Sequence, residues 1–271
     1  MIRPAEIQQL ARKEGVRDTQ IEKDYIISWI LIGLAHNELL SDVLAFKGGT
    51  LLKKFYFKDY RHSEDLDFTL LKSKNNKQIK DAFETSFEYI KEESNIPLSI
   101  TEFEEHETEN INFYISYTGP LGGIGKRVKV DISKNELLQF NIEQKALFDT
   151  YSDHIDSVLK CYSLPEVITE KLRSLLSRQQ PRDFYDLWYL SEQGKMEMSN
   201  YALEYAAKAS YKELNPNNLE KRLEQILPVF NTRWTSSISE QIKYLPPFEQ
   251  VSRELGRHFR KLFKKYPALR K

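Results

Sequence analysis

The sequence predicts an α+β protein, with a mixed sheet and covering helices followed by a helical C-terminal domain. Short strand patterns and a glycine-rich turn occur between residues 43 and 132. After Tyr162 the strand patterns vanish, and helical patterns dominate from about Pro165 onward. Loops at residues 215–218 and 246–247 interrupt these helices. We therefore expect two domains, residues 1–160 and residues 161–271.

The composition indicates a well-ordered protein large enough for two packed domains. Of the 271 residues 40% are hydrophobic, and Lys+Arg and Asp+Glu number 40 each, so no global field attracts nucleic acid or membrane. The longest apolar run, Tyr25 to Ala35, is shorter than the roughly 20 residues that span a bilayer. Cys161 is the only cysteine, which excludes an internal disulfide. We expect a cytoplasmic protein with no membrane role.

In the first domain a long helix is expected over Thr19–Leu40, which is apolar nearly all round and therefore buried. A strand over Val43–Phe46, a turn over Lys47–Thr50 and a helix over Leu51–Phe57 follow. Polar and apolar residues alternate from Asp65 to Leu71, which predicts a half-buried strand.

The rest of this domain combines a helix with a hairpin. Helical periodicity covers Lys77–Lys91, and strand patterns cover Ile111–Tyr117 and Arg127–Ile132, joined by the glycine-rich turn Gly119–Gly123. An acidic stretch before the hairpin is expected to be a solvated strand or loop face; it contains Glu102, Glu104, Glu105, Glu107 and Glu109.

Three aspartates have the pattern of a metal site. Asp65 and Asp67 lie on one face of a predicted strand, and Asp131 lies on another strand, where it can supply a third carboxylate. Nucleotidyl transfer uses two Mg²⁺ ions about 3.5 to 4 Å apart, held by such carboxylates. A lone Asp-x-Asp pattern is more often a solvent-facing pair, but the glycine turn upstream favours the metal site.

Gly48 and Gly49 lie where a strand meets a helix, and their bare backbone N–H groups suit a phosphate. The Thr50 hydroxyl can donate to the same phosphate, and Lys47 belongs to the same turn. The alternative is a plain turn in which Thr50 caps the helix. The Gly-x-x-x-x-Gly-Lys-Ser/Thr pattern of a P-loop is absent.

A second polar group lies in the helical half. On a helix Lys171 and Arg178 share one face, and two cations on one face suit a triphosphate. Pro181 fits the first turn of the next helix, whose polar side carries Asp183 and Asp186. Alternatively, Asp183 complements the helix N-terminus and pairs with a neighbouring arginine.

Together these motifs resemble the AbiEii/AbiGii toxin family of nucleotidyltransferases, in the family's order and over roughly residues 20 to 190. The segments that carry the resemblance are residues 22–25 (Glu-Lys-Asp-Tyr), 46–50 (Phe-Lys-Gly-Gly-Thr), 61–67 (Arg-His-Ser-Glu-Asp-Leu-Asp) and 170–187. The resemblance implies a DNA polymerase β-like core and a helical domain that completes the nucleotide cleft. It also implies a toxin–antitoxin or phage-defence effector, with a cognate antitoxin as partner.

The family's functional positions fall on named residues of this chain. Gly49 and Thr50 match the phosphate-binding motif, although members often have Gly-Ser there, and Asp65 and Asp67 match the metal-binding pair. Lys171 matches the nucleotide-binding lysine. Asp183 matches a late catalytic acid, which leaves both Asp131 and Asp183 as candidates for the general base.

The resemblance implies transfer of NMP from an NTP to an acceptor hydroxyl, and a tRNA 3′ end is the acceptor we expect. Mg²⁺ is the expected cofactor, with Mn²⁺ as the alternative. The rival functions are a non-catalytic NTP-binding or interaction module and a transferase that modifies protein hydroxyls.

The C-terminal segment is the best local candidate for RNA contact. Residues 253–271 carry one acid, Glu254, and eight cations: Arg253, Arg257, Arg260, Lys261, Lys264, Lys265, Arg270 and Lys271. Apolar residues at helical spacing in the same segment allow the alternative of a solvated docking helix.

Overall fold

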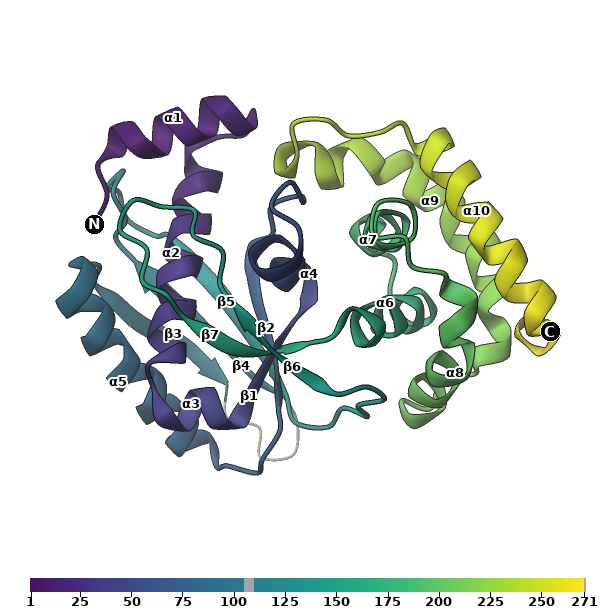
Figure 1. The fold of residues 1–271 in the computed structure, drawn as a ribbon, viewed down its shortest axis with the longest axis horizontal. Coiled ribbons are helices and arrows are strands. Elements are labelled where there is room, and N and C mark those ends of the chain that lie inside the picture. Colours follow the sequence, from purple (N-terminus) through teal and green to yellow (C-terminus); the bar gives the residue numbers. More distant parts are fainter. Residues whose placement is uncertain (105–109, 271) are drawn as a thin grey trace. The chain divides into compact units, whose positions relative to one another are not determined.

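The computed structural model describes residues 1–104 and 110–270, which separate into two compact units (Figure 1). Unit 1 comprises Met1–Glu136 and Ile142–Tyr162, and unit 2 comprises Leu137–Asn141 and Ser163–Lys271. Four residues of the predicted acidic and basic segments lie outside the described residues: Glu105, Glu107, Glu109 and Lys271.

The sheet lies entirely in unit 1, and in the described residues it has seven strands in the order β3-β4-β5-β2-β1-β7-β6. The strands are β1 (Leu44–Lys47), β2 (Asp65–Leu70), β3 (Leu98–Glu104), β4 (Ile111–Tyr117), β5 (Arg127–Ser133), β6 (Ile142–Ala146) and β7 (Val158–Tyr162). Strand β1 runs parallel to β7, and β2 runs parallel to β5, whereas the other neighbours are antiparallel. The predicted mixed sheet is therefore confirmed.

The helices of unit 1 are α1 (Pro4–Glu14), α2 (Asp18–Ala35), α3 (Glu38–Val43), α4 (Gly48–Leu51), the π-helical η1 (Leu52–Tyr56) and α5 (Asn76–Ser94). Helix α2 is buried nearly all round, as predicted from its apolar sequence. The prediction of one helix to Leu40 is wrong. Asn37 takes an extended conformation and its side chain accepts a hydrogen bond from Leu40 N at 3.1 Å, which starts α3 as a separate helix.

The two faces of the sheet differ in character. One face is apolar: the rings of Phe83 on α5 and Phe113 on β4 lie 5.0 Å apart, and Phe46 and Phe68 pack on the same side at 5.1 Å. The other face is polar because the alternate residues of β2, β4 and β5 carry a charge, a hydroxyl or, at Asn112, an amide. The predicted alternation in β2 is confirmed, and it places Asp65 and Asp67 on the polar face.

The hairpin of β4 and β5 is confirmed within one residue of the expected ends. Strands β6 and β7 were not expected. Strand β6 is an edge strand with mostly exposed polar residues, so it lacks the alternation that identifies half-buried strands. Strand β3 is the other edge, and Glu102 lies in it with a φ of 52° at a break in the register with β4.

Unit 2 is helical. Its helices are α6 (Leu164–Ser177), α7 (Pro181–Glu192), α8 (Ala202–Tyr211), α9 (Leu219–Ile238) and α10 (Phe248–Lys265), with short 3-10 turns η2 (Met198–Tyr201), η3 (Pro216–Asn218), η4 (Ser239–Gln241) and η5 (Pro267–Arg270). The helical character after Tyr162 and the start of a helix at Pro181 are thus confirmed. Across residues 1–104 and 110–270, no helix is both long and apolar enough to cross a bilayer.

A buried carboxylate explains why Leu137–Asn141 belongs to unit 2. Glu166 Oε2 accepts hydrogen bonds from the backbone N–H groups of Gln139 (2.9 Å) and Phe140 (2.8 Å). The other oxygen of Glu166 forms a buried ion pair with Lys208, whose ammonium also donates to the Leu137 carbonyl at 2.8 Å. These contacts hold the segment against α6 and α8.

Candidate active site

Strand register brings the predicted carboxylates of unit 1 together. Asp67 on β2 is paired with Asp131 on β5, and Asp65 is paired with Lys129. Paired residues of neighbouring strands point to the same face, about 4.8 Å apart between strands. Asp65, Asp67 and Asp131 therefore lie at adjoining positions on the polar face of the sheet.

The glycine turn packs directly against these residues. Gly48 has a φ of +84°, and a Cβ atom built there would overlap Oδ2 of Asp67. A Cβ atom on Gly49 would lie 2.8 Å from Nη2 of Arg61 and 3.2 Å from Oγ of Ser63. Gly48 is thus required by its left-handed backbone and by the close approach of Asp67, and a side chain at Gly49 would need Arg61 to shift. The glycine turn and the strand that carries Asp65 and Asp67 are therefore packed against each other.

Helix α4 begins at Gly48, three residues before the predicted start, with Lys47 as its N-cap residue. Thr50 does not cap the helix: its hydroxyl is buried and donates to the backbone carbonyl of Asp65 at 2.6 Å. This contact ties the helix to the strand that carries the carboxylates. It leaves backbone N–H groups, rather than the Thr50 hydroxyl, as the donors that this turn can offer to an anion.

The Lys47 side chain also makes contacts inside unit 1. Its buried ammonium donates to Ser133 Oγ at 3.1 Å and pairs with Glu136 at 3.3 Å. Tyr162 lies beneath it, with its ring centre 5.8 Å from the ammonium, and donates or accepts a 2.5 Å hydrogen bond with Thr69. Lys47 therefore braces β1 against β5 behind the predicted nucleotide-binding turn.

The donor chemistry of the three aspartates fits a hard divalent cation such as Mg²⁺, which prefers carboxylate oxygens. As the side chains stand, no three His, Cys, Asp or Glu side chains in the described parts of the chain are gathered closely enough to hold a metal ion. Asp131 Oδ2 instead accepts from Lys129 Nζ at 2.7 Å. Burial lowers the pKa of Lys129, but the Asp131 carboxylate outweighs burial and raises that pKa above its usual value.

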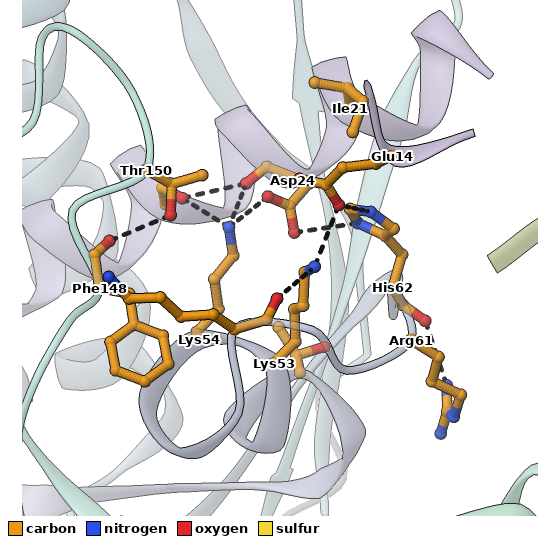
Figure 2. Close-up of polar contacts among 12 residues, drawn as sticks. Glu14, Ile21, Asp24, Lys53, Lys54, Arg61, His62, Phe148 and Thr150 are labelled. Atoms are coloured by element: carbon orange, nitrogen blue, oxygen red, sulfur yellow. Dashed lines mark hydrogen bonds and ion pairs between the residues drawn. The ribbon is translucent and has the colours of Figure 1, made fainter. Parts of the chain in front are cut away.

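A largely buried cluster of charges, here called the Asp24 cluster, connects α1 and α2 with residues that follow the glycine turn (Figure 2). It consists of Glu14, Asp24, Lys53, Lys54, His62 and Tyr151. Lys54 Nζ contacts Asp24 Oδ2 at 2.5 Å and Ser28 Oγ at 2.8 Å, and Tyr151 donates to the same Asp24 oxygen at 2.6 Å.

His62 and Lys53 complete the Asp24 cluster through Glu14. The His62 ring contacts Glu14 Oε2 at 2.7 Å through Nε2 and lies 3.5 Å from Asp24 Oδ1 through Nδ1, and Lys53 contacts Glu14 at 3.1 Å. Lys53 and Lys54 follow the glycine turn, and His62 precedes the Asp65 strand by three residues. The cluster thus fixes both halves of the motif to α1 and α2.

The charged groups of the Asp24 cluster shift one another's pKa values. Burial raises the pKa of Asp24, but the charges of Lys54 and His62 outweigh burial and hold that pKa well below its usual range. Burial lowers the pKa of His62, yet Asp24 and Glu14 raise it above the usual value of a histidine. The folded protein therefore favours an ionised Asp24 beside a protonated His62.

Unit 2 brings together a second set of predicted residues, here called the Lys171 cluster: Lys171, Arg178, Asp183 and Asp186. Lys171 Nζ lies 2.8 Å from Asp183 and 2.6 Å from Asp186, both of which are buried. Arg178 follows the end of α6 in an extended conformation. Its guanidinium donates hydrogen bonds to both carboxylate oxygens of Asp183, at 2.6 and 2.9 Å. The predicted pairing of Asp183 with a neighbouring arginine is therefore observed.

Asp183 is held as a carboxylate by its neighbours. Burial raises its pKa, but the charges of Lys171 and Arg178 outweigh burial and lower it below the usual aspartate value. A carboxylate with a lowered pKa is a weaker proton acceptor. Its contacts suit the positioning of the two cations.

Comparison with protein families identifies the chain. The model of the family described as "Nucleotidyl transferase AbiEii toxin, Type IV TA system" matches residues 29–264. The chain belongs to this family. It is therefore a nucleotidyltransferase toxin of a type IV toxin–antitoxin system, which implies an NTP as substrate and a cognate antitoxin as partner.

Two solved structures share the AbiEii fold seen here. MenT4, a nucleotidyltransferase toxin from Mycobacterium tuberculosis H37Rv, is 16% identical with a TM-score of 0.66, over 99% of this chain and 90% of that chain. JHP933 from Helicobacter pylori is 16% identical with a TM-score of 0.54, over 92% of this chain and 94% of that chain. At these identities the similarity shows the fold, and the predicted α+β class is confirmed. A comparison with curated proteins found no match.

Sequence reasoning missed the supporting residues of the AbiEii site. Arg61 is buried beside Gly49, and its Nη1 donates to the His62 carbonyl at 3.2 Å. Asp24 and Lys54 were not predicted to have a role, although Asp24 lies in a charged Glu-Lys-Asp segment of an otherwise apolar helix. Charges placed within an apolar helix are the signal that identifies such buried pairs, because they must find partners when the helix is buried.

Proposed function

We propose that this AbiEii toxin transfers a nucleoside monophosphate from an NTP to the 3′ hydroxyl of an RNA, with tRNA as the expected acceptor, in a reaction that requires Mg²⁺. The observation that carries the proposal is the register of β2 with β5, which pairs Asp67 with Asp131 beside the glycine turn. Carboxylates and a phosphate-binding turn side by side are what phosphoryl transfer requires from a protein.

Asp65, Asp67 and Asp131 would hold the metal through their oxygens. When bound, Mg²⁺ would neutralise the triphosphate and lower the pKa of the attacking hydroxyl. The backbone N–H groups of the turn at Gly48 and Gly49 would bind phosphate oxygens of the NTP. Mn²⁺ has the same preference for oxygen and is the alternative cofactor.

Lys171 and Arg178 would bind the triphosphate, as the sequence predicts. Arg178 is the accessible member of the pair, since its side chain is 53% exposed whereas that of Lys171 is 8% exposed. Asp183 and Asp186 would hold Lys171 in place. Lys47 and Thr50, which are both engaged inside unit 1, would act by fixing the turn.

Asp131 is the general base that we propose. It is paired in register with Asp67, beside the other two carboxylates, and Lys129 Nζ donates a hydrogen bond of 2.7 Å to its Oδ2. Asp183 is the weaker candidate because its pKa is lowered by two cations.

A basic stripe on α10 supports RNA as the acceptor. Arg253, Arg260 and Lys264 are exposed and lie on one side of the helix, by their spacing of seven and four residues. Arg257 and Lys261 pair with Glu192 and Glu197, so part of the predicted patch serves to dock α10 within unit 2. We propose that the remaining stripe contacts the phosphate backbone of RNA in the cytoplasm.

The proposal is tested by incubating the purified protein with tRNA, Mg²⁺ and each α-labelled NTP in turn. We expect labelled tRNA with wild-type protein and a loss of more than about 100-fold with Asp67→Asn, since removal of one essential electrostatic group costs that much. Asp81→Asn is the matched control, because Asp81 is an exposed aspartate on α5. Folded protein that labels only protein, or that binds NTP without releasing pyrophosphate, would reject the RNA acceptor.

A further inference from the structure

A strip of side chains extends the polar face of the sheet beyond the carboxylates, toward the edge at β3. In the row through Asp65, β5 contributes Lys129 and β4 contributes Tyr114. In the next row, Arg127 on β5 is paired with Ser116 on β4. None of these side chains is fully buried, so the strip is an accessible surface of unit 1.

Tyr114 and Arg127 form a stacked pair within this strip. The guanidinium carbon of Arg127 lies 3.9 Å from the centre of the Tyr114 ring, and the Arg127 side chain is 46% exposed. Arg127 also pairs with Glu102 on β3, whose side chain is 60% exposed. Two flat groups held in contact offer a π surface and a positive charge, the combination that binds unpaired bases of nucleic acids.

The chemistry of the proposed function decides which ligand reaches this strip. In phosphoryl transfer the attacking oxygen and the leaving oxygen lie roughly in line on opposite sides of the phosphorus. The glycine turn, proposed here to bind the leaving phosphates, follows β1 on one side of β2, whereas β5 and β4 lie on the other side. The acceptor hydroxyl therefore approaches from the side of Asp131, over β5 and β4.

The spacing of the strands is consistent with a nucleotide at this place. Tyr114 lies two strands from Asp65, about 10 Å across the sheet. A 3′-terminal nucleotide whose hydroxyl lies at the carboxylates would carry its own or the preceding base toward β4.

We propose that Tyr114 and Arg127 form a stacking platform for a base at the single-stranded 3′ end of the acceptor RNA. This inference rests on the proposed function and adds the place where the acceptor binds. Stacking accepts any base, so the platform would recognise an unpaired end rather than a particular sequence. The structural alternative is that the pair only stabilises the β4–β5 edge of the sheet.

The test compares Tyr114→Ala with Tyr114→Phe, which keeps the flat ring. We expect Tyr114→Ala to raise KM for tRNA about tenfold, a typical loss for one stacking aromatic, with KM for the NTP unchanged. Tyr114→Phe should behave as wild type. The control is Tyr89→Ala on α5, which removes a ring stacked on His36 at 4.7 Å in another part of unit 1. An unchanged KM for tRNA in Tyr114→Ala, or an equal loss in Tyr89→Ala, would overturn the platform.

A binding measurement separates failure of the platform from failure of the proposed function. Fluorescence anisotropy of a labelled RNA hairpin with a short single-stranded 3′ extension gives a Kd that needs no catalysis. We expect about tenfold weaker binding by Tyr114→Ala, and no difference for a blunt hairpin. If wild-type protein transfers no nucleotide to RNA, this difference still supports the platform, and equal Kd values for the extended hairpin reject it.

Discussion

The Asp24 cluster of unit 1 and the Lys171 cluster of unit 2 are both built from buried carboxylates paired with lysines, yet they differ in access. In the Asp24 cluster the paired Asp24 and Lys54 side chains are 3% and 2% exposed. In the Lys171 cluster the buried Asp183 forms an ion pair with Arg178, whose side chain is 53% exposed. An anion from solution can reach Arg178, whereas the Asp24–Lys54 pair is sealed by protein.

The difference suggests different tasks for similar chemistry. A sealed pair with no route for a ligand holds the glycine turn and the carboxylate strand in place. A pair with one exposed cation can exchange a protein carboxylate for a phosphate of the substrate at little cost, because both are anions. In this proposal access, rather than the presence of paired charges, distinguishes support from binding.

The largest expected effect on stability comes from breaking the sealed Asp24–Lys54 pair. Asp24→Ala should lower the free energy of unfolding by about 3 to 5 kcal/mol, because it leaves Lys54 buried without its carboxylate. Denaturant unfolding monitored by circular dichroism measures this loss. Replacing both partners, with Asp24→Leu and Lys54→Met together, should recover part of it, since no buried charge then remains unpaired. A loss below about 1 kcal/mol for Asp24→Ala would show that water reaches the pair.

A smaller effect is expected from the histidine of the same cluster. His62→Gln should destabilise the protein by about 1 to 3 kcal/mol at pH 6, the range for hydrogen bonds to charged groups. The pKa of His62 is raised on folding, so its stabilisation is complete below the unfolded pKa of about 6.5 and is lost as pH rises through the folded value.

The pH dependence is the decisive readout for His62. Glu14 and Asp24 contact the ring and Lys53 acts on it by its charge, and both acids keep their charge at neutral pH because their pKa values are lowered. Unfolding curves recorded from pH 5.5 to pH 9 should show the wild type and His62→Gln approaching each other toward alkaline pH. Parallel stability curves over that range would mean that His62 acts by packing alone.

How much of this could be predicted depends on the distance between partners in the sequence. Strand β2, the β4–β5 hairpin and the carboxylates were predicted because the alternating pattern is local. The pairing of Thr50 with the Asp65 carbonyl, and of Lys47 with Glu136, depends on which strands are neighbours, which periodicity does not reveal. The helix start at Gly48 was missed because the glycine pair reads as a turn, and the close approach of Asp67 that requires Gly48 is a tertiary contact.

The charged residues of the Lys171 cluster were predicted, but the contacts of Lys171 with Asp183 and Asp186 were not. On a helical wheel Lys171 and Arg178 share one face, and Asp183 and Asp186 share the polar side of the next helix, but a wheel does not show how two helices pack. The wheel assumed that α6 continues to Arg178, whereas α6 ends at Ser177 and Arg178 is extended. That extension turns the guanidinium onto Asp183, which a continuous helix would not predict.

The smallest effect on stability is expected at the exposed end of the Lys171 cluster. Arg178→Gln should cost about 1 kcal/mol of unfolding free energy, since Arg178 itself is half-exposed and Lys171, which it shares with Asp186, still contacts Asp183. If Arg178 binds the triphosphate, the same change should raise KM for the NTP about tenfold, which corresponds to the loss of one charged hydrogen bond. Arg257→Gln is the matched control, because its side chain is 54% exposed and paired with Glu192. A KM that stays at the wild-type value in Arg178→Gln would place this cluster beside the Asp24 cluster as support, and access would then not be the property that separates them.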